Sequence, residues 1–219
     1  FADFFEAYDR AIDVPTDKVG VWVSGFFGSG KSHFLKMLSY LLANREVGGV
    51  AAIDYFDGKV ADPMVYSRMR RAAAVPTEAI LFNIDSKGGH WKGGSEAKTA
   101  LLLAFARVFY EHLGFYGEDL KLARMEQFVE SQGKTDAFRA AFARVNGGDW
   151  LADRANYEFF EDDIVEVMQE VLGMSREAAQ HWFDGSERAA ISPDELTEQI
   201  VAYADRRAGE CGGAFRLLF

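Results

Sequence analysis

The sequence has very little cysteine or proline, and it has no long apolar run. Cys211 is the only cysteine among 219 residues, which excludes an intramolecular disulfide framework and fits a reducing cytosol. No run reaches the roughly 18 apolar residues of a membrane helix, and residues 1–6 lack the basic segment of a signal peptide. We therefore expect a cytoplasmic protein with no membrane partner. Because the first residue is not methionine, we also expect a piece of a longer protein.

Basic side chains are outnumbered by acidic ones. The chain has 24 Lys and Arg against 34 Asp and Glu, for a formal net charge of −10. This balance argues against a large phosphate-gripping surface for nucleic acid, although a local basic patch is compatible with it. Hydrophobic residues make up 49% of the chain, which excludes wholesale disorder. The length indicates one domain, or one domain with a large insertion.

Hydrophobic patterning predicts strands at both ends of a long helical region. We expect buried strands over residues 19–24, 79–85 and 215–219, because these segments are short, apolar and rich in β-branched or aromatic residues. The helical stripe of apolar residues predicts helices over 31–43, 97–113, 118–130, 136–145, 150–172 and 192–208, and a short one from Ser175. Ser192 to Glu195 form a capping box with Pro193 at the first helical position.

One motif in the chain carries a specific chemistry. Residues 25–32 fit G-x-x-x-x-G-K-[ST] completely, with an apolar segment before them and an amphipathic helix after them. The glycines let the backbone curl so that successive N–H groups face a phosphate chain, and the helix start adds the positive end of its dipole. The predicted nucleotide-binding residues are Gly25, Phe26, Phe27, Gly28, Ser29, Gly30, Lys31, Ser32 and His33.

Two of these residues have assigned roles. Lys31 is the predicted charge at the β- and γ-phosphates and a candidate catalytic residue, and Ser32 is the predicted ligand of Mg²⁺. His33 lies either near the nucleotide or only on the surface of the first helical turn.

Hydrolysis also needs an acidic residue that holds Mg²⁺ at the end of an apolar strand. No apolar strand ending in Asp-Glu occurs in the sequence. Asp85, after the apolar residues 80–84, is one candidate catalytic residue, and Asp54, after 50–53, is a weaker one. A third interpretation, which we favour, is that residues 217–219 begin such a strand and the chain stops before the acidic pair. True absence of the pair is the remaining alternative.

Several blocks resemble one family. Residues 22–38 are similar to the P-loop ATPases of BREX phage-defence systems, called BrxC or PglY. Residues 82–87, Trp150 with 159–163, and 171–175 look like later blocks of that family, so the resemblance covers nearly the whole chain. The Gly25–Gly28 flank and the later blocks make it specific, because the P-loop alone is shared by many proteins.

The resemblance implies an α/β fold of the AAA-like, additional-strand branch of P-loop NTPases. We expect a single domain with a parallel-sheet core at residues 1–95 and 212–219 and a helical insertion over about 96–211. In the family, a strand ending in Asp-Glu follows a segment similar to 215–219, which supports truncation before this Walker B pair. The implied function is Mg²⁺-dependent ATP hydrolysis in antiphage defence. The implied partners are a methyltransferase, a phosphatase-like component, DNA contacted through other parts of the protein, and further copies in a homo-oligomer.

Two other functions stay open. A nucleotide-dependent scaffold would bind ATP without appreciable turnover, and the long helical insertion suits that role. A small-molecule kinase would use the same loop, but it needs an arginine-bearing lid that the sequence does not show.

Three further groups of residues have both a functional and a structural interpretation. Arg68, Arg70 and Arg71 either grip phosphate or form a solvated helix face. The acidic residues between 158 and 170 either bind metal or face solvent, and the aromatic start (Phe1, Phe4, Phe5, Tyr8) either stacks on adenine or packs into the core. We favour the structural interpretation for each.

Overall fold

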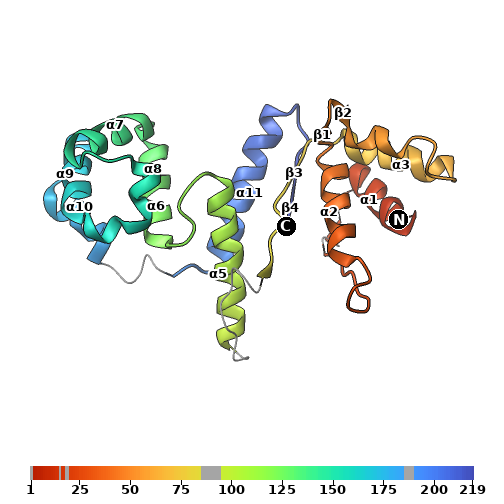
Figure 1. Ribbon diagram of the computed structural model, residues 1–219, viewed down its shortest axis with the longest axis horizontal. Helices are drawn as coiled ribbons and strands as arrows, with labels where there is room; N and C mark the ends of the chain where they lie inside the picture. Colours follow the sequence, from red (N-terminus) through yellow and green to blue (C-terminus); the bar gives the residue numbers. More distant parts are fainter. Residues whose placement is uncertain (1, 15, 18–19, 85–94, 185–189) are drawn as a thin grey trace. The chain divides into compact units, whose positions relative to one another are not determined.

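The computed structural model describes residues 2–14, 16–17, 20–84, 95–184 and 190–219 (Figure 1). The chain divides into two compact units. Unit 1 comprises residues 1–81 and 199–219, and unit 2 comprises residues 82–198. A helical unit is therefore flanked in sequence by two parts of the first, with boundaries at 82 and 198 where the sequence analysis places them at about 96 and 211.

Unit 1 combines helices with two short strand pairs. Its elements are α1 (Ala2–Asp13), α2 (Lys31–Leu42), β1 (Glu46–Val47), β2 (Val50–Ala51), the 3-10 helix η1 (Ala52–Phe56), α3 (Pro63–Ala74), β3 (Thr77–Ala79), the later part of α11 (Pro193–Glu210) and β4 (Arg216–Leu218). The helix predicted over 31–43 and the strand predicted over 215–219 are confirmed.

The strands β3 and β4 form a parallel pair from segments that are far apart in the sequence. Thr77 lies opposite Arg216 and Ala79 opposite Leu218. The ladder continues one residue further, because the Ile80 amide donates to the Leu218 carbonyl at 2.8 Å. The other pair, β1 with β2, is an antiparallel hairpin.

Two strand predictions need correction. Residues 20–24 form no strand, and Val21 and Trp22 are 64% and 91% exposed. An apolar segment becomes a strand only where a neighbour completes its ladder, and no strand of the described residues pairs with residues 20–24. The strand predicted over 79–85 is displaced toward the N-terminus: it runs from Thr77 to Ala79, and Leu81 is 51% exposed.

The core of unit 1 lies between α1, α2 and α3. Phe5, Leu41 and Met69 are almost completely buried there, and Phe4 and Tyr8 pack against them. The aromatic start of the chain therefore packs into a core, as we favoured, while residue 1 is outside the described part.

Ion pairs join α1 to α3. The Arg71 guanidinium pairs with Asp9 and Asp13, both at 2.9 Å, and Arg68 lies 3.7 Å from Glu6. The hydrogen bond and charge of Asp13 raise the pKa of Arg71. These two arginines thus connect helices, a role that the sequence analysis did not foresee.

Unit 2 is helical throughout its described part. Its elements are α5 (Ser95–His112), α6 (Leu120–Ser131), α7 (Thr135–Val145), α8 (Trp150–Asp153), the 3-10 helix η2 (Arg154–Phe159), α9 (Glu161–Leu172), α10 (Arg176–Asp184) and the start of α11. The single helix predicted over 150–172 is wrong, because the backbone leaves helical geometry at Asn156. Polar contacts hold this break: Arg154 binds Glu126, and the Tyr157 hydroxyl donates to Asp119 at 2.9 Å.

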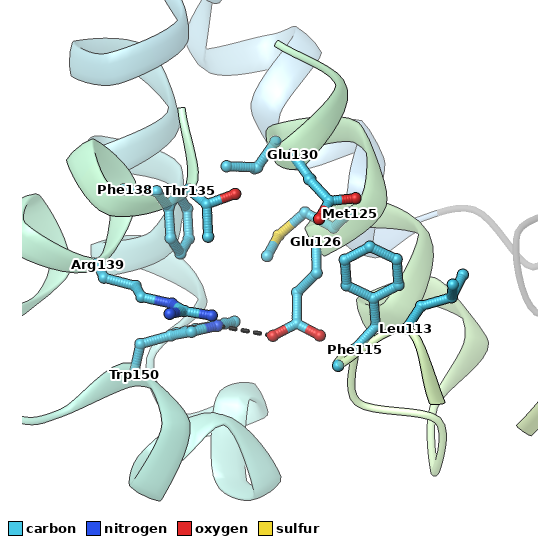
Figure 2. A pocket seen from close by; sticks show the side chains of 11 residues that line it. Leu113, Phe115, Met125, Glu126, Glu130, Thr135, Phe138, Arg139 and Trp150 are labelled. Carbon is cyan, nitrogen blue, oxygen red and sulfur yellow. Dashed lines mark hydrogen bonds between the residues drawn. The ribbon is translucent and has the colours of Figure 1, made fainter. Parts of the chain in front are cut away.

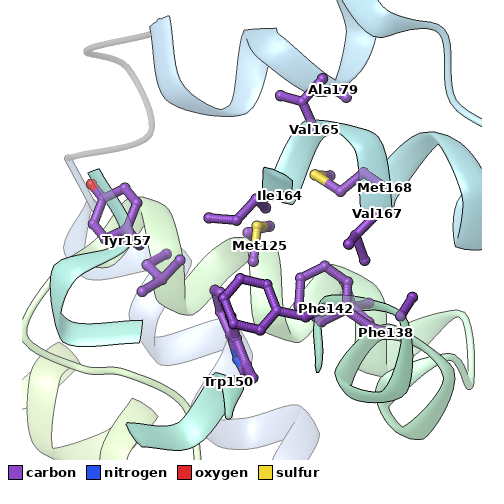
Figure 3. Packing of buried hydrophobic residues seen from close by; sticks show 13 residues of the cluster. Met125, Phe138, Phe142, Trp150, Tyr157, Ile164, Val165, Val167, Met168 and Ala179 are labelled. Atoms are coloured by element: carbon purple, nitrogen blue, oxygen red, sulfur yellow. The ribbon is translucent and has the colours of Figure 1, made fainter. Parts of the chain in front are cut away.

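Aromatic rings and one helix stripe form the core of unit 2 (Figure 3). The Trp150 ring meets the rings of Phe138 and Phe142 edge to face, with both centroid distances at 5.1 Å. Ile164 and Met168, on the predicted apolar face of α9, are fully buried beside them. This core is made of unit 2 residues alone.

Candidate phosphate-binding loop

The residues of the Gly-rich motif form a tight loop that leads into α2. Gly28 and Gly30 have φ of +79° and +86°, a left-handed conformation that costs a residue with a side chain about 1–2 kcal/mol. A Cβ on Gly25 would lie 2.7 Å from the Ser29 hydroxyl. The loop is closed by a hydrogen bond from the Ser29 amide to the Phe26 carbonyl at 3.1 Å. The backbone conformation thus favours glycine at positions 28 and 30, and the close approach of the Ser29 side chain favours it at position 25.

The start of α2 has no side-chain cap. Gly30 is the N-cap residue and offers no oxygen to the first turn. The amides of Lys31, Ser32 and His33 donate no hydrogen bond to any residue in the described part of the chain. A helix start with unsatisfied N–H groups and a positive dipole end favours an anion.

The Lys31 side chain folds back over the loop. Its ammonium nitrogen donates to the carbonyls of Gly25 at 2.9 Å and Phe26 at 2.8 Å. No carboxylate of the described residues pairs with Lys31, so its positive charge is not neutralised within that part of the protein. The loop therefore combines a free helix start with one unneutralised cation.

The other motif residues are open to solvent. The Phe26 and Phe27 side chains are more than 90% exposed. Because a phenyl ring has no hydrogen-bond donor, these two residues offer a phosphate only their backbone N–H groups. Ser32 and His33 are exposed in the first turn of α2. All nine predicted nucleotide-binding residues, 25–33, are thus contiguous and described.

Of the two predicted acidic candidates, only Asp54 lies within the residues that the structure describes. Asp85 lies outside the described residues, as do Ser86 and residues 87–94. Asp54 lies in the 3-10 helix η1 and not at the end of an apolar strand.

No cluster of three His, Cys, Asp or Glu side chains among the described residues could hold a metal ion. In the acidic run of unit 2, Asp162 pairs with Arg176 and Glu170 with Arg144. Ion pairing thus accounts for part of that run. Ser32 remains the one predicted metal ligand within the described loop.

Sequence reasoning missed two features. One is the buried carboxylate of Glu126, which accepts hydrogen bonds from the Trp150 indole and from Arg154, both at 2.8 Å, beside a small cavity of about 80 Å³ (Figure 2). The other is an open groove along α2, described below. A single acid within an apolar helix stripe, as at Glu126, is a weak sequence signal because most such residues face solvent.

No protein-family model matches the chain, and no solved structure matches it. Among the described residues, none of the helices combines the length and apolar character needed to cross a membrane.

Proposed function

We propose that the loop of residues 25–32 binds Mg²⁺-ATP. The observation that carries this proposal is the loop itself: two left-handed glycines, an uncapped helix start and the Lys31 ammonium lie within one short segment. Each of these features favours the binding of a polyphosphate, and together they are typical of a phosphate-binding loop.

Each part of the loop has a proposed task. The amides of Gly28 and of residues 30–33, together with the dipole of α2, hold phosphate oxygens, and Lys31 exchanges its two carbonyl contacts for the β- and γ-phosphates. The choice of adenine as the base rests on the family resemblance alone.

The donor set fits Mg²⁺ only in part. The Ser32 hydroxyl is one oxygen ligand, and Mg²⁺ keeps several waters and phosphate oxygens, so a single protein ligand suffices for binding. When bound, the ion would neutralise phosphate charge. Among the described residues no carboxylate contacts Ser32 or Lys31.

We further propose that the protein hydrolyses ATP as part of a BREX-type antiphage ATPase. This step rests on the sequence resemblance, with Asp85 or an acidic pair beyond Phe219 as the missing carboxylate. The cytoplasmic location, the homo-oligomer, the methyltransferase and phosphatase-like partners and the role of DNA are proposals on the same basis.

A nucleotide-dependent scaffold is the second candidate. The lack of a carboxylate at Lys31 and Ser32 within the described residues favours it, because static binding needs the loop but not the acid. Single-turnover hydrolysis of radiolabelled ATP by the protein separates the two: release of phosphate supports the ATPase, and saturable binding without release supports the scaffold.

The binding proposal is tested by equilibrium titration with fluorescent ATP and Mg²⁺. Lys31→Ala removes the loop cation and should abolish saturable binding. Lys36→Ala is the matched control, because it makes the same charge change on an exposed residue of the same helix, outside the loop. Equal loss of ATP binding in both variants, or no loss of ATP binding in either, would contradict the assigned role of Lys31.

A further inference from the structure

An open groove of about 840 Å³ runs along α2 within unit 1. Its lining is largely apolar and aromatic: Met37, Tyr40, Tyr55 and Phe56 are exposed or half-buried, and buried core residues such as Met69 form its floor. This volume lies within the roughly 300–1,000 Å³ range of ligand-binding clefts. Exposed apolar surface of this kind marks a binding site more often than plain protein surface.

One wall of the groove is a continuous helix stripe. α2 contributes His33, Lys36, Met37, Tyr40 and Leu41, which follow the spacing i, i+3, i+4, i+7 and i+8. The stripe therefore extends for about 12 Å along the helix axis at 1.5 Å per residue. A trough of this length along a helix accommodates about two turns of another helix.

The charges at the groove have a single sign. Lys36 and Lys59 supply positive charge, His33 lies beside them, and no Asp or Glu lines the groove. None of these three side chains has an ion-pair or hydrogen-bond partner among the described residues. By contrast, many arginines of this acidic chain are paired, among them Arg71 with Asp9 and Arg154 with Glu126.

We propose that this groove binds an acidic amphipathic helix of a partner protein. The apolar lining would receive anchors spaced i, i+3, i+4 and i+7 on that helix, and Lys36 and Lys59 would pair with its flanking Asp or Glu side chains. The apolar stripe of α2 is complementary in shape to a partner helix, and the two unpaired lysines are complementary to its negative charge. The proposal does not depend on nucleotide binding.

The test is a selection from a displayed library of helical peptides, carried out on the intact chain without nucleotide. We expect the enriched peptides to carry apolar residues at the spacing i, i+3, i+4 and i+7, with an excess of Asp and Glu beside them. Their affinity, measured by fluorescence anisotropy, should fall with added salt because rim charges are exposed and screened.

Variants locate the peptide on the groove. The double variant Lys36→Glu/Lys59→Glu should weaken binding about tenfold or more, since two attractions become repulsions. Lys98→Glu/Lys134→Glu is the matched control, because it changes the same charge at two exposed lysines outside the groove, and it should shift the affinity less than about twofold. Urea unfolding of both variants verifies that they fold.

Four outcomes would overturn the proposal. The first is a selection that enriches no sequence over the scaffold background, and the second is enrichment of peptides without an acidic excess. The third is peptide binding that survives the charge reversal at Lys36 and Lys59. The fourth is saturable binding of sodium decanoate with no peptide enrichment, which would make the groove a small-molecule site.

Discussion

Glu126 is a buried carboxylate whose oxygens accept hydrogen bonds from three groups. The Trp150 indole and Arg154 donate to one oxygen, both at 2.8 Å, and the Tyr116 amide donates to the other at 2.5 Å. Arg154 also forms an ion pair with it. The residue therefore joins α6, α8 and η2 within unit 2.

Removal of this carboxylate should be costly. Glu126→Ala leaves a buried indole N–H and a half-buried guanidinium without their acceptor, so we expect the free energy of unfolding to fall by about 3 kcal/mol. Glu130→Ala, one turn further along α6 and exposed, should change it by less than about 0.5 kcal/mol. Urea unfolding followed by tryptophan fluorescence measures both, and a small effect at Glu126 would show that the network contributes little.

Residue-scale predictions from the sequence were most complete where a motif fixes backbone geometry. Gly28 and Gly30 adopt positive φ within the predicted loop, and Lys31 begins the predicted helix. Glu126 was not foreseen, because its burial depends on Trp150, which is distant in sequence and reaches it only after the helices pack.

At the scale of elements, β3 is attached to both β4 and α11. Glu78 on β3 accepts a hydrogen bond from the Tyr203 hydroxyl at 2.6 Å and pairs with Arg207 at 2.8 Å. Burial, followed by the hydrogen bond and charge of Glu78, raises the pKa of Tyr203 to about 12. A tyrosine with a raised pKa binds its proton more tightly in the folded state than in the unfolded state.

The free energy of unfolding should therefore decrease at high pH. The contribution of Tyr203 to stability is complete below its ordinary pKa of 10 and is lost as pH rises from 10 to about 12. Tyr203→Phe should therefore lower the free energy of unfolding by about 1 kcal/mol at neutral pH. It should also make the decrease of this free energy between pH 10 and about 12 less steep. Urea midpoints across this range measure the effect, and an unchanged slope in Tyr203→Phe would show that another group causes the fall.

Helices could be predicted where the apolar spacing continues over several turns. Strands could not be predicted from one segment, because their formation depends on pairing with another. The buried face of α9 and the boundaries of α2 follow from the spacing of their apolar residues, which places these residues on one side of each helix. The segment 20–24 has strand composition and yet forms no strand. Pairing is a property of two segments, and the sequence of one does not determine it.

At the scale of the whole molecule, the described residues form two separate hydrophobic core clusters, one in each unit. Phe142 belongs to the core of unit 2, and Leu41 to that of unit 1. Each is almost fully buried, so Phe142→Ala and Leu41→Ala should each cost about 3–4 kcal/mol. Because the cores share no residue, we expect each substitution to loosen mainly its own unit.

Hydrogen exchange followed by mass spectrometry resolves the two units. Phe142→Ala should raise exchange in α9 and leave α2 protected, and Leu41→Ala should do the reverse. Equal loss of protection in both helices from either substitution would mean that the chain unfolds as one cooperative body.

The central claim is that the loop at the start of α2 holds a nucleoside triphosphate. Calorimetric titration of the folded protein with ATP and Mg²⁺ tests it most directly. We predict saturable heat with about one site per chain, which disappears in Lys31→Ala while the unfolding transition is retained. No saturable heat from wild-type protein that unfolds cooperatively would contradict the claim.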